Sequence, residues 1–215
     1  YGALPEHYPL VGNSLLKTLG QYADEAWTPE LELAWTEAYG AITELMLEGA
    51  DYTKEQVATI QTQTFAYIAI AAADNVLTIT LDRANKKNAL HPQMVNEIAY
   101  ALHYAHFEKS IWVVVIQAKG NIFCAGADLK AMAGIIEPNN STVPQPNGEV
   151  LIGELFNKVY KPTIAKVTGD VYAGGFFFLA GCNIVVAQDA IKFGLPEVKR
   201  GIYPFQVMTA LLKVM

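Results

Sequence analysis

The stretch GDVYAGGFFFLAGC, residues 169–182, decides how the most informative part of the chain folds. Two glycines stand directly before Phe176, Phe177 and Phe178, in a run that otherwise reads as buried. Glycine inside an apolar run costs backbone entropy, so it marks places where something approaches the backbone closely. Three successive aromatic side chains cannot share one face of a helix or a strand. We therefore expect a segment that is buried on all sides and whose backbone is closely approached by another group.

This stretch contains the second of two glycine-containing turns that follow predicted buried strands. The first turn lies in NIFCAGADLKAM, residues 121–132, after the strand pattern IWVVVIQA; the second lies in YAGGFFFLAG, residues 172–181, after KPTIAKVTG. Both turns place small residues where a helix could begin, and amides at a helix N-terminus lack acceptors and carry partial positive charge. Two such amides converging on one point would hold a developing oxyanion, such as the enolate of a thioester. The alternative is two tight strand-to-helix turns without a function.

Strand and helix patterns alternate around these turns, which predicts an α/β fold. Residues 75–83 alternate as a strand does, residues 92–108 place apolar side chains on one helical face, and residues 182–188 read as a further buried strand. Residues 137–149 are a polar, Pro- and Asn-rich loop that we expect to be mobile. Before residue 50 the pattern is helical, most clearly over residues 28–50, with a weaker amphipathic pattern over residues 7–23.

Composition narrows the class of protein. The 215 residues are 52% hydrophobic with a net charge of −6, which suits one domain or a domain plus a piece and disfavours nucleic acid as a partner. We expect no membrane span, because no run of about eighteen apolar residues occurs. Cys124 and Cys182 lie in separate apolar stretches, which suggests buried thiols and a cytoplasmic protein. We expect no metal site. The chain opens at Tyr1 and stops inside an amphipathic run, so we expect a piece of a longer protein.

Residues 62–215 resemble the crotonase (enoyl-CoA hydratase/isomerase) superfamily. Four stretches carry the resemblance in order: NVLTITLDRANKKNAL, NIFCAGADLKAM, KPTIAKVTGDVYAGG and IKFGLPEVKRGIYP. The resemblance implies a crotonase-like ββα spiral, C-terminally truncated, that binds an acyl-CoA thioester. Coenzyme A would be part of the substrate, with no further cofactor, and a homo-oligomer, trimer or hexamer, would be expected.

The resemblance also assigns roles to residues. The amides of Ala127 and Gly174 would bind the thioester oxygen. The coenzyme A moiety would be contacted by Lys87, Asn88, Ala89, Ala125, Asp128 and Leu129. Arg83, Lys86 and Lys87 would place positive charge beside its phosphates, although Lys86 could equally belong to a solvated loop and Asp128 could simply cap the following helix.

One catalytic carboxylate of the hydratases is absent from the matching position. Relatives that are hydratases carry glutamates three and twenty-three residues after the glycine of the oxyanion site, and here these positions hold Phe177 and Glu197. A single carboxylate can take a proton from one carbon of an enolisable thioester and return it to another. The resemblance therefore favours an enoyl-CoA isomerase; hydration through Glu197 alone and an acyl-CoA-binding pseudoenzyme stay open, as does a surface position for Glu197.

The N-terminal segment raises a separate resemblance. Residues 1–50 are similar to the last two helices of a bacterial globin, which would make them a haem-binding remnant, although a haem-ligating histidine would fall before Tyr1. The predicted organisation is thus a globin-type helical pair over residues 1–52, a junction over residues 53–61 and a crotonase-like domain over residues 62–215.

Overall fold

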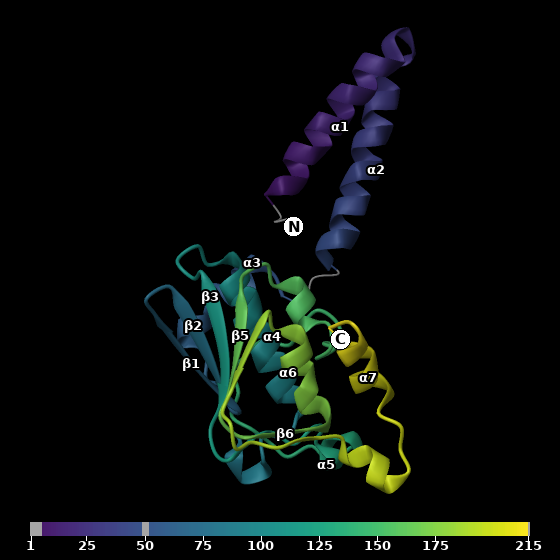
Figure 1. Cartoon of the computed structure of the whole chain (residues 1–215). Coiled ribbons are helices and arrows are strands. Elements are labelled where there is room, and N and C mark those ends of the chain that lie inside the picture. The colour runs from purple at the N-terminus through teal and green to yellow at the C-terminus, as the bar shows by residue number, and fades with distance from the viewer. Residues whose placement is uncertain (1–5, 49–51, 215) are drawn as a thin grey trace. The chain divides into compact units, whose positions relative to one another are not determined.

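The computed structural model describes residues 6–48 and 52–214 and divides the chain into two compact units, Tyr1–Asp51 and Tyr52–Met215 (Figure 1). In the first unit, α1 (His7–Ala23) and α2 (Pro29–Glu48) are joined through the 3-10 turn Asp24–Ala26. Both predicted helices are confirmed. The Thr28 hydroxyl accepts a hydrogen bond from the Leu31 amide at 3.3 Å, and this bond caps α2 as expected for threonine before proline.

The helical pair buries little of its apolar surface. Tyr39 of α2 packs over Gly12 of α1 and donates its hydroxyl proton to the Tyr8 carbonyl at 2.8 Å. Leu33, Ile42 and several other large apolar side chains of this unit are exposed. The similarity to globin helices stays a prediction.

The second unit contains a five-stranded sheet in the order β1-β2-β3-β5-β7. β1 pairs antiparallel with β2, and the remaining neighbours are parallel. The predicted helix over residues 92–108 is α4, and its apolar face is buried against the sheet. Figure 1 shows α4 and α6 covering one face of this sheet. The α/β fold is therefore confirmed. The bounds are β1 (Ile68–Ala73), β2 (Val76–Leu81), α4 (Pro92–Phe107), β3 (Val113–Ala118), β5 (Thr163–Val167) and β7 (Ile184–Ala187).

A second sheet of three short strands, in the order β4-β6-β8, is parallel throughout. Each strand leads directly into a turn or short helix, as the glycine-containing turns predicted. The bounds are β4 (Ile122–Cys124), α5 (Leu129–Met132), β6 (Asp170–Tyr172), α6 (Phe176–Gly181), β8 (Phe193–Gly194) and α7 (Phe205–Leu212), with 3-10 turns at Ala84–Lys86, Leu155–Lys158, Ala173–Gly175 and Pro196–Arg200.

The three phenylalanines of α6 point in three directions. Phe178 is fully buried and meets Phe123 and Phe156 edge-on, with ring centroids 5.7 and 6.0 Å apart. Phe176 is half-buried against Phe193, and Phe177 is half-buried. The expectation of burial on all sides therefore holds for Phe178 but not for its two neighbours, because one helical turn reaches past the edge of the core.

Residues 53–61 are part of the second unit rather than a junction. Thr53 and Gln56 form a capping box at the start of α3 (Lys54–Val57), in which each side chain accepts from the other residue's amide. Val57 and Ile60 are buried in the core of the second unit. The sequence of this segment does not predict that it packs in the core, because only isolated positions in it are apolar.

Two further expectations are corrected. The strand over residues 182–188 is not buried: all four residues of β7 are exposed, because this strand pairs only with β5, at the sheet edge. The loop over residues 137–149 has no helix or strand, as predicted, but it is anchored midway. Thr142 exchanges two hydrogen bonds with the backbone of Thr64, and the Ser141 hydroxyl accepts from the Gln93 side chain at 3.0 Å.

Candidate active site

Three strand ends bring the predicted catalytic groups to one edge of the small sheet. β4, β6 and β8 are parallel neighbours, so their carboxyl ends meet on the same side, where α/β proteins bind ligands. Ala127 follows β4 by three residues, Gly174 follows β6 by two, and Glu197 follows β8 by three. The topology therefore places two candidate amides and one carboxylate on adjacent connections.

The turns that carry the two amides are in direct contact. A Cβ atom built on Gly174 would lie 3.4 Å from the Gly126 Cα and 3.6 Å from the Ala127 nitrogen. On Gly175, such an atom would lie 2.9 Å from the Cys124 carbonyl oxygen. The paired glycines are thus required because the turn after β4 occupies the space that side chains would need.

Among the described residues, neither amide donates a hydrogen bond to another backbone group. Leu90 donates its amide to the Gly126 carbonyl at 2.8 Å and accepts from the Asp128 amide at 3.1 Å, so it bonds to both neighbours of Ala127 and leaves the Ala127 amide directed elsewhere. Gly174 lies in the first turn of a 3-10 helix, where amides have no acceptor within the helix. The geometry is compatible with two donors at one acceptor.

Backbone conformations that L-residues rarely adopt gather at this contact. Gly126 has φ +93° and Ala173 has φ +49°. A Cβ on Gly126 would lie 2.5 Å from the Ala173 Cβ, and real Cβ atoms do not approach so closely. Strained backbone persists where the surroundings determine it, and it gathers at functional sites.

Glu197 occupies the first turn of the 3-10 helix Pro196–Arg200. Its side chain is partly buried, and its Oε2 atom is covered from solvent without a hydrogen-bond partner in the described residues. The register pairs Tyr172 with Gly194, so the chain leading to Glu197 runs beside the turn that carries Gly174. Glu197 is therefore not an ordinary solvated surface carboxylate.

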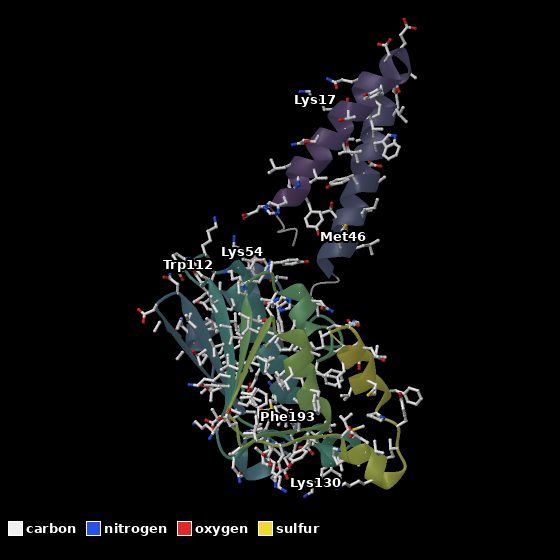
Figure 2. All side chains as sticks on the ribbon, viewed as in Figure 1. Lys17, Met46, Lys54, Trp112, Lys130 and Phe193 are labelled. Carbon is white, nitrogen blue, oxygen red and sulfur yellow. The ribbon has the colours of Figure 1, made fainter. Side chains whose placement is uncertain are left out.

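An open pocket of about 260 Å³ adjoins the turn after β4. The first two motifs contain seven of the residues predicted to bind the substrate, and five of these line the pocket: Lys87, Ala89, Ala127, Asp128 and Leu129. Gly174, which belongs to the third motif, does not line it. Lys130, on α5 and labelled in Figure 2, also lines it. Within the described residues no carboxylate lies within ion-pair distance of Lys87 or Lys130, so the pocket carries positive charge despite the acidic chain.

Asp128 is held in place by the protein rather than offered to the pocket. Its carboxylate binds the buried Arg83 guanidinium at 2.7 Å and accepts from the amides of Lys130 and Ala131, which caps α5. Burial opposes ionisation of Asp128, but the Arg83 hydrogen bond and the two amides hold its pKa below the usual value. The cap that the sequence left as an alternative is thus present.

Asn88 and Ala125 do not line the pocket. The Asn88 side chain is fully buried; it accepts from the Arg83 amide at 2.9 Å and donates to the carbonyls of Lys119 and Ile122 at 2.9 and 2.8 Å. These bonds consume its side chain, so Asn88 joins two loops instead of presenting a polar group to a ligand. Ala125 donates its amide to the Lys87 carbonyl at 3.1 Å and fixes the pocket wall.

Phe177 lies where the hydratase pattern has a carboxylate. A Cβ on Gly153 would lie 3.3 Å from its ring, so Phe177 packs against the loop before the 3-10 turn Leu155–Lys158. The half-buried ring supplies an apolar surface and no proton donor or acceptor at this position.

Other reactive groups do not extend the site. Burial raises the pKa of the Cys124 thiol to about 12, which fits a packing residue and not a nucleophile. Residues 6–48 and 52–214 contain no group of three or more His, Cys, Asp or Glu side chains arranged to hold a metal ion. No helix in these same ranges is both long and apolar enough to cross a lipid bilayer.

Sequence reasoning missed three residues around the pocket. His91 and Glu137 line it. The Tyr67 ring contacts both Arg83 and His91, with its centroid 4.9 Å from the Arg83 Cζ and 5.0 Å from the His91 ring centroid. The signal at His91 was the following Pro92, which marks the start of a helix and gives its preceding residue a capping role. Nothing in the sequence indicated Glu137, which reaches the pocket from the loop.

Comparison with known proteins identifies a family that the chain matches. A family profile described as enoyl-CoA hydratase/isomerase matches residues 71–214. The chain is 37% identical to mevalonyl-coenzyme A hydratase of Aspergillus fumigatus over 131 residues, 60% of this chain and 47% of that protein. It is 35% identical to 2,3-dehydroadipyl-CoA hydratase of Escherichia coli over 137 residues, 63% of this chain and 51% of that protein.

The fold has solved counterparts as well. A crystal structure of an enoyl-CoA hydratase/isomerase from Mycobacterium paratuberculosis matches with a TM-score of 0.56 and 26% identity, covering 71% of this chain and 57% of that one. The chain spans about half the length of the curated relatives it matches.

Proposed function

Because the chain belongs to the enoyl-CoA hydratase/isomerase family, we propose that it binds an acyl-CoA thioester and moves a double bond within the acyl chain. The amides of Ala127 and Gly174 bind the thioester oxygen, and Glu197 moves the proton. The observation that carries the proposal is the contact between the turns after β4 and β6, with Glu197 on the adjacent connection.

The proposed reaction uses one carboxylate. Glu197 takes a proton from C2 of a 3-enoyl thioester, and the electrons of that C–H bond move toward the carbonyl to give a dienolate. The two amides stabilise the negative oxygen, where each donor typically contributes about 10²–10³ in rate. The protonated Glu197 then returns the proton to C4, which leaves the 2-enoyl thioester and the original carboxylate. No water is consumed, so a phenylalanine at position 177 is compatible with the chemistry.

The positive pocket accounts for the nucleotide end of the ligand. Lys87 and Lys130 supply charge for phosphate oxygens, while Arg83 and Asp128 neutralise each other inside the wall. Ala89 and Leu129 add small or apolar surface along the pocket. We propose an assembly of identical subunits and a cytoplasmic location on the resemblance alone.

Hydratase activity is the second candidate, and the names of the A. fumigatus and E. coli relatives favour it. The test incubates the chain with a 3-enoyl-CoA and separately with a 2-enoyl-CoA, and identifies the products by mass and chromatography. Conversion of 3-enoyl to 2-enoyl, lost in Glu197→Gln, is expected. Faster hydration of the 2-enoyl-CoA than isomerisation would replace isomerase by hydratase, and activity unchanged in Glu197→Gln would remove Glu197 from the proposal.

A further inference from the structure

The neutral side chain of His91 carries a buried proton for which residues 6–48 and 52–214 offer no acceptor. His91 is 2% exposed and is the N-cap of α4, where its Nδ1 atom accepts the Gln93 amide at 3.1 Å. A ring nitrogen that accepts a hydrogen bond holds no proton, so in the neutral ring the proton sits on Nε2. Nε2 is covered from solvent and has no hydrogen-bond partner among the described residues.

The surroundings keep the ring neutral and in place. Burial and the nearby Arg83 charge lower the pKa of His91, outweighing the carboxylates of Asp128, Glu137 and Glu97. The ring also contacts Tyr67. A buried N–H without an acceptor is costly, so such a group in a native protein calls for a missing partner.

His91 lines the positive pocket, as does Ala127. We propose that His91 is a ligand-binding residue whose Nε2–H group donates a hydrogen bond to an oxygen atom of the coenzyme A moiety, either a phosphate oxygen or a pantetheine carbonyl. The inference rests on the proposed function, since it assigns a donor to the ligand of that same pocket.

Access to this proton requires a small opening of the wall. Glu137 and Lys86 line the same pocket, and their ion pair is 3.6 Å long between side chains that are 48% and 42% exposed. Exposed pairs of this kind contribute little to stability, so ligand phosphates can replace Glu137 as the partner of Lys86 at low cost.

Two substitutions separate ligand binding from capping. In His91→Asn, the side-chain oxygen retains the cap on the Gln93 amide, but the NH₂ group is one bond from Cγ and ends short of the position of Nε2. In His91→Gln, a side-chain N–H can take the place of Nε2, but the cap is weakened. Calorimetric titration with coenzyme A should give about threefold to tenfold weaker binding for His91→Asn and near wild-type binding for His91→Gln. Thermal unfolding should show the opposite order.

A second measurement does not depend on substitution. Imidazole ¹⁵N spectra of the wild-type chain should place the proton on Nε2 and show a shift of that nitrogen when coenzyme A is added. Repeating both measurements with pantetheine identifies the acceptor: an effect with pantetheine indicates a carbonyl, and an effect with coenzyme A alone indicates a phosphate.

Equal affinity of wild type and His91→Asn, with an unmoved Nε2 signal, would overturn the assignment of His91 while leaving the proposed function intact. Weakened binding in His91→Gln but not in His91→Asn would reduce His91 to a helix cap. Absence of coenzyme A binding by the wild-type chain would instead overturn the proposed function, and this inference with it.

Discussion

Substitution of Gly126 by alanine tests the packing of the two turns. Gly126 has φ +93°, and a new Cβ would lie 2.5 Å from the Ala173 Cβ and 3.0 Å from the Gly174 nitrogen. Carbon atoms in favourable contact are about 3.5–4.0 Å apart. The turn after β6 must therefore move by roughly 1 Å, and it carries one of the two proposed donors.

The size of the effect has two parts. A left-handed conformation costs a residue with a Cβ about 1–2 kcal/mol, and inserting a carbon into a packed site costs about 1–3 kcal/mol, so the free energy of unfolding should fall by about 2–5 kcal/mol. A displacement near 1 Å in a catalytic site costs about 10²-fold in rate. Turnover should fall by at least that factor if Gly174 is a donor.

Gly134→Ala is the matched control. Gly134 has φ +80°, and nothing lies within 4 Å of a Cβ built there, so this variant bears the conformational cost of about 1–2 kcal/mol without the collision. Urea unfolding followed by circular dichroism gives the stabilities, and the enoyl-CoA assay gives the rates. Equal stability and equal turnover of the two variants would refute the close contact between the turns.

Three further results are expected. Glu97→Gln should lower the free energy of unfolding by about 1–3 kcal/mol in urea titrations, because the buried Glu97 carboxylate accepts two backbone amides at 2.8 and 2.9 Å and an amide NH₂ cannot accept. Burial raises the pKa of Cys124 and of Cys182 to about 12, so iodoacetamide at pH 8 should label the unfolded chain at both thiols and the native chain at neither, as read by mass spectrometry. Asp128→Asn should destabilise the protein by about 2–4 kcal/mol at pH 7 because the buried Arg83 guanidinium loses the negative charge that balances it.

The stability that Asp128 contributes should depend on pH. The pKa of Asp128 is below its usual value in the folded protein, so its ionised form stabilises the fold above the unfolded pKa of about 3.9 and this contribution is lost as pH falls through and below that value. The stability difference between wild type and Asp128→Asn should shrink over this window. A stability difference that stays constant with pH would argue against the Arg83–Asp128 ion pair. Labelling of the native thiols would argue against their burial, and unchanged stability in Glu97→Gln would argue against the buried hydrogen bonds of Glu97.

Periodicity predicted the elements that pack on one face. The apolar side chains of α4 recur at helical spacing, and β3 begins with the continuous apolar run VVVI between two parallel neighbours. The exposure of β7 could not be read in the same way, because IVVA is as apolar as a central strand and only the sheet order reveals that it lies at the edge. The sequence predicts a junction over residues 53–61 because Val57 and Ile60 are isolated apolar positions, and their burial depends on partners far along the chain.

The motifs located the pocket but not the roles of all its residues. Lys87, Ala89 and Leu129 line it as expected. The Asn88 side chain instead donates hydrogen bonds to backbone carbonyls more than thirty residues away. A hydrogen bond between residues so far apart cannot be predicted from the neighbouring sequence. For the same reason, the sequence could not predict that the Nε2 proton of His91 lacks an acceptor among the described residues. The structure shows this because the Gln93 amide donates to Nδ1 and so fixes the proton on Nε2.

The most direct test of the central claim is a crystal structure of the chain with a bound saturated acyl-CoA. The thioester oxygen should lie about 2.7–3.1 Å from the backbone nitrogens of both Ala127 and Gly174, with the Glu197 carboxylate beside the acyl carbons. A thioester oxygen bound by neither amide, or a Glu197 side chain turned away from the acyl group, would contradict it.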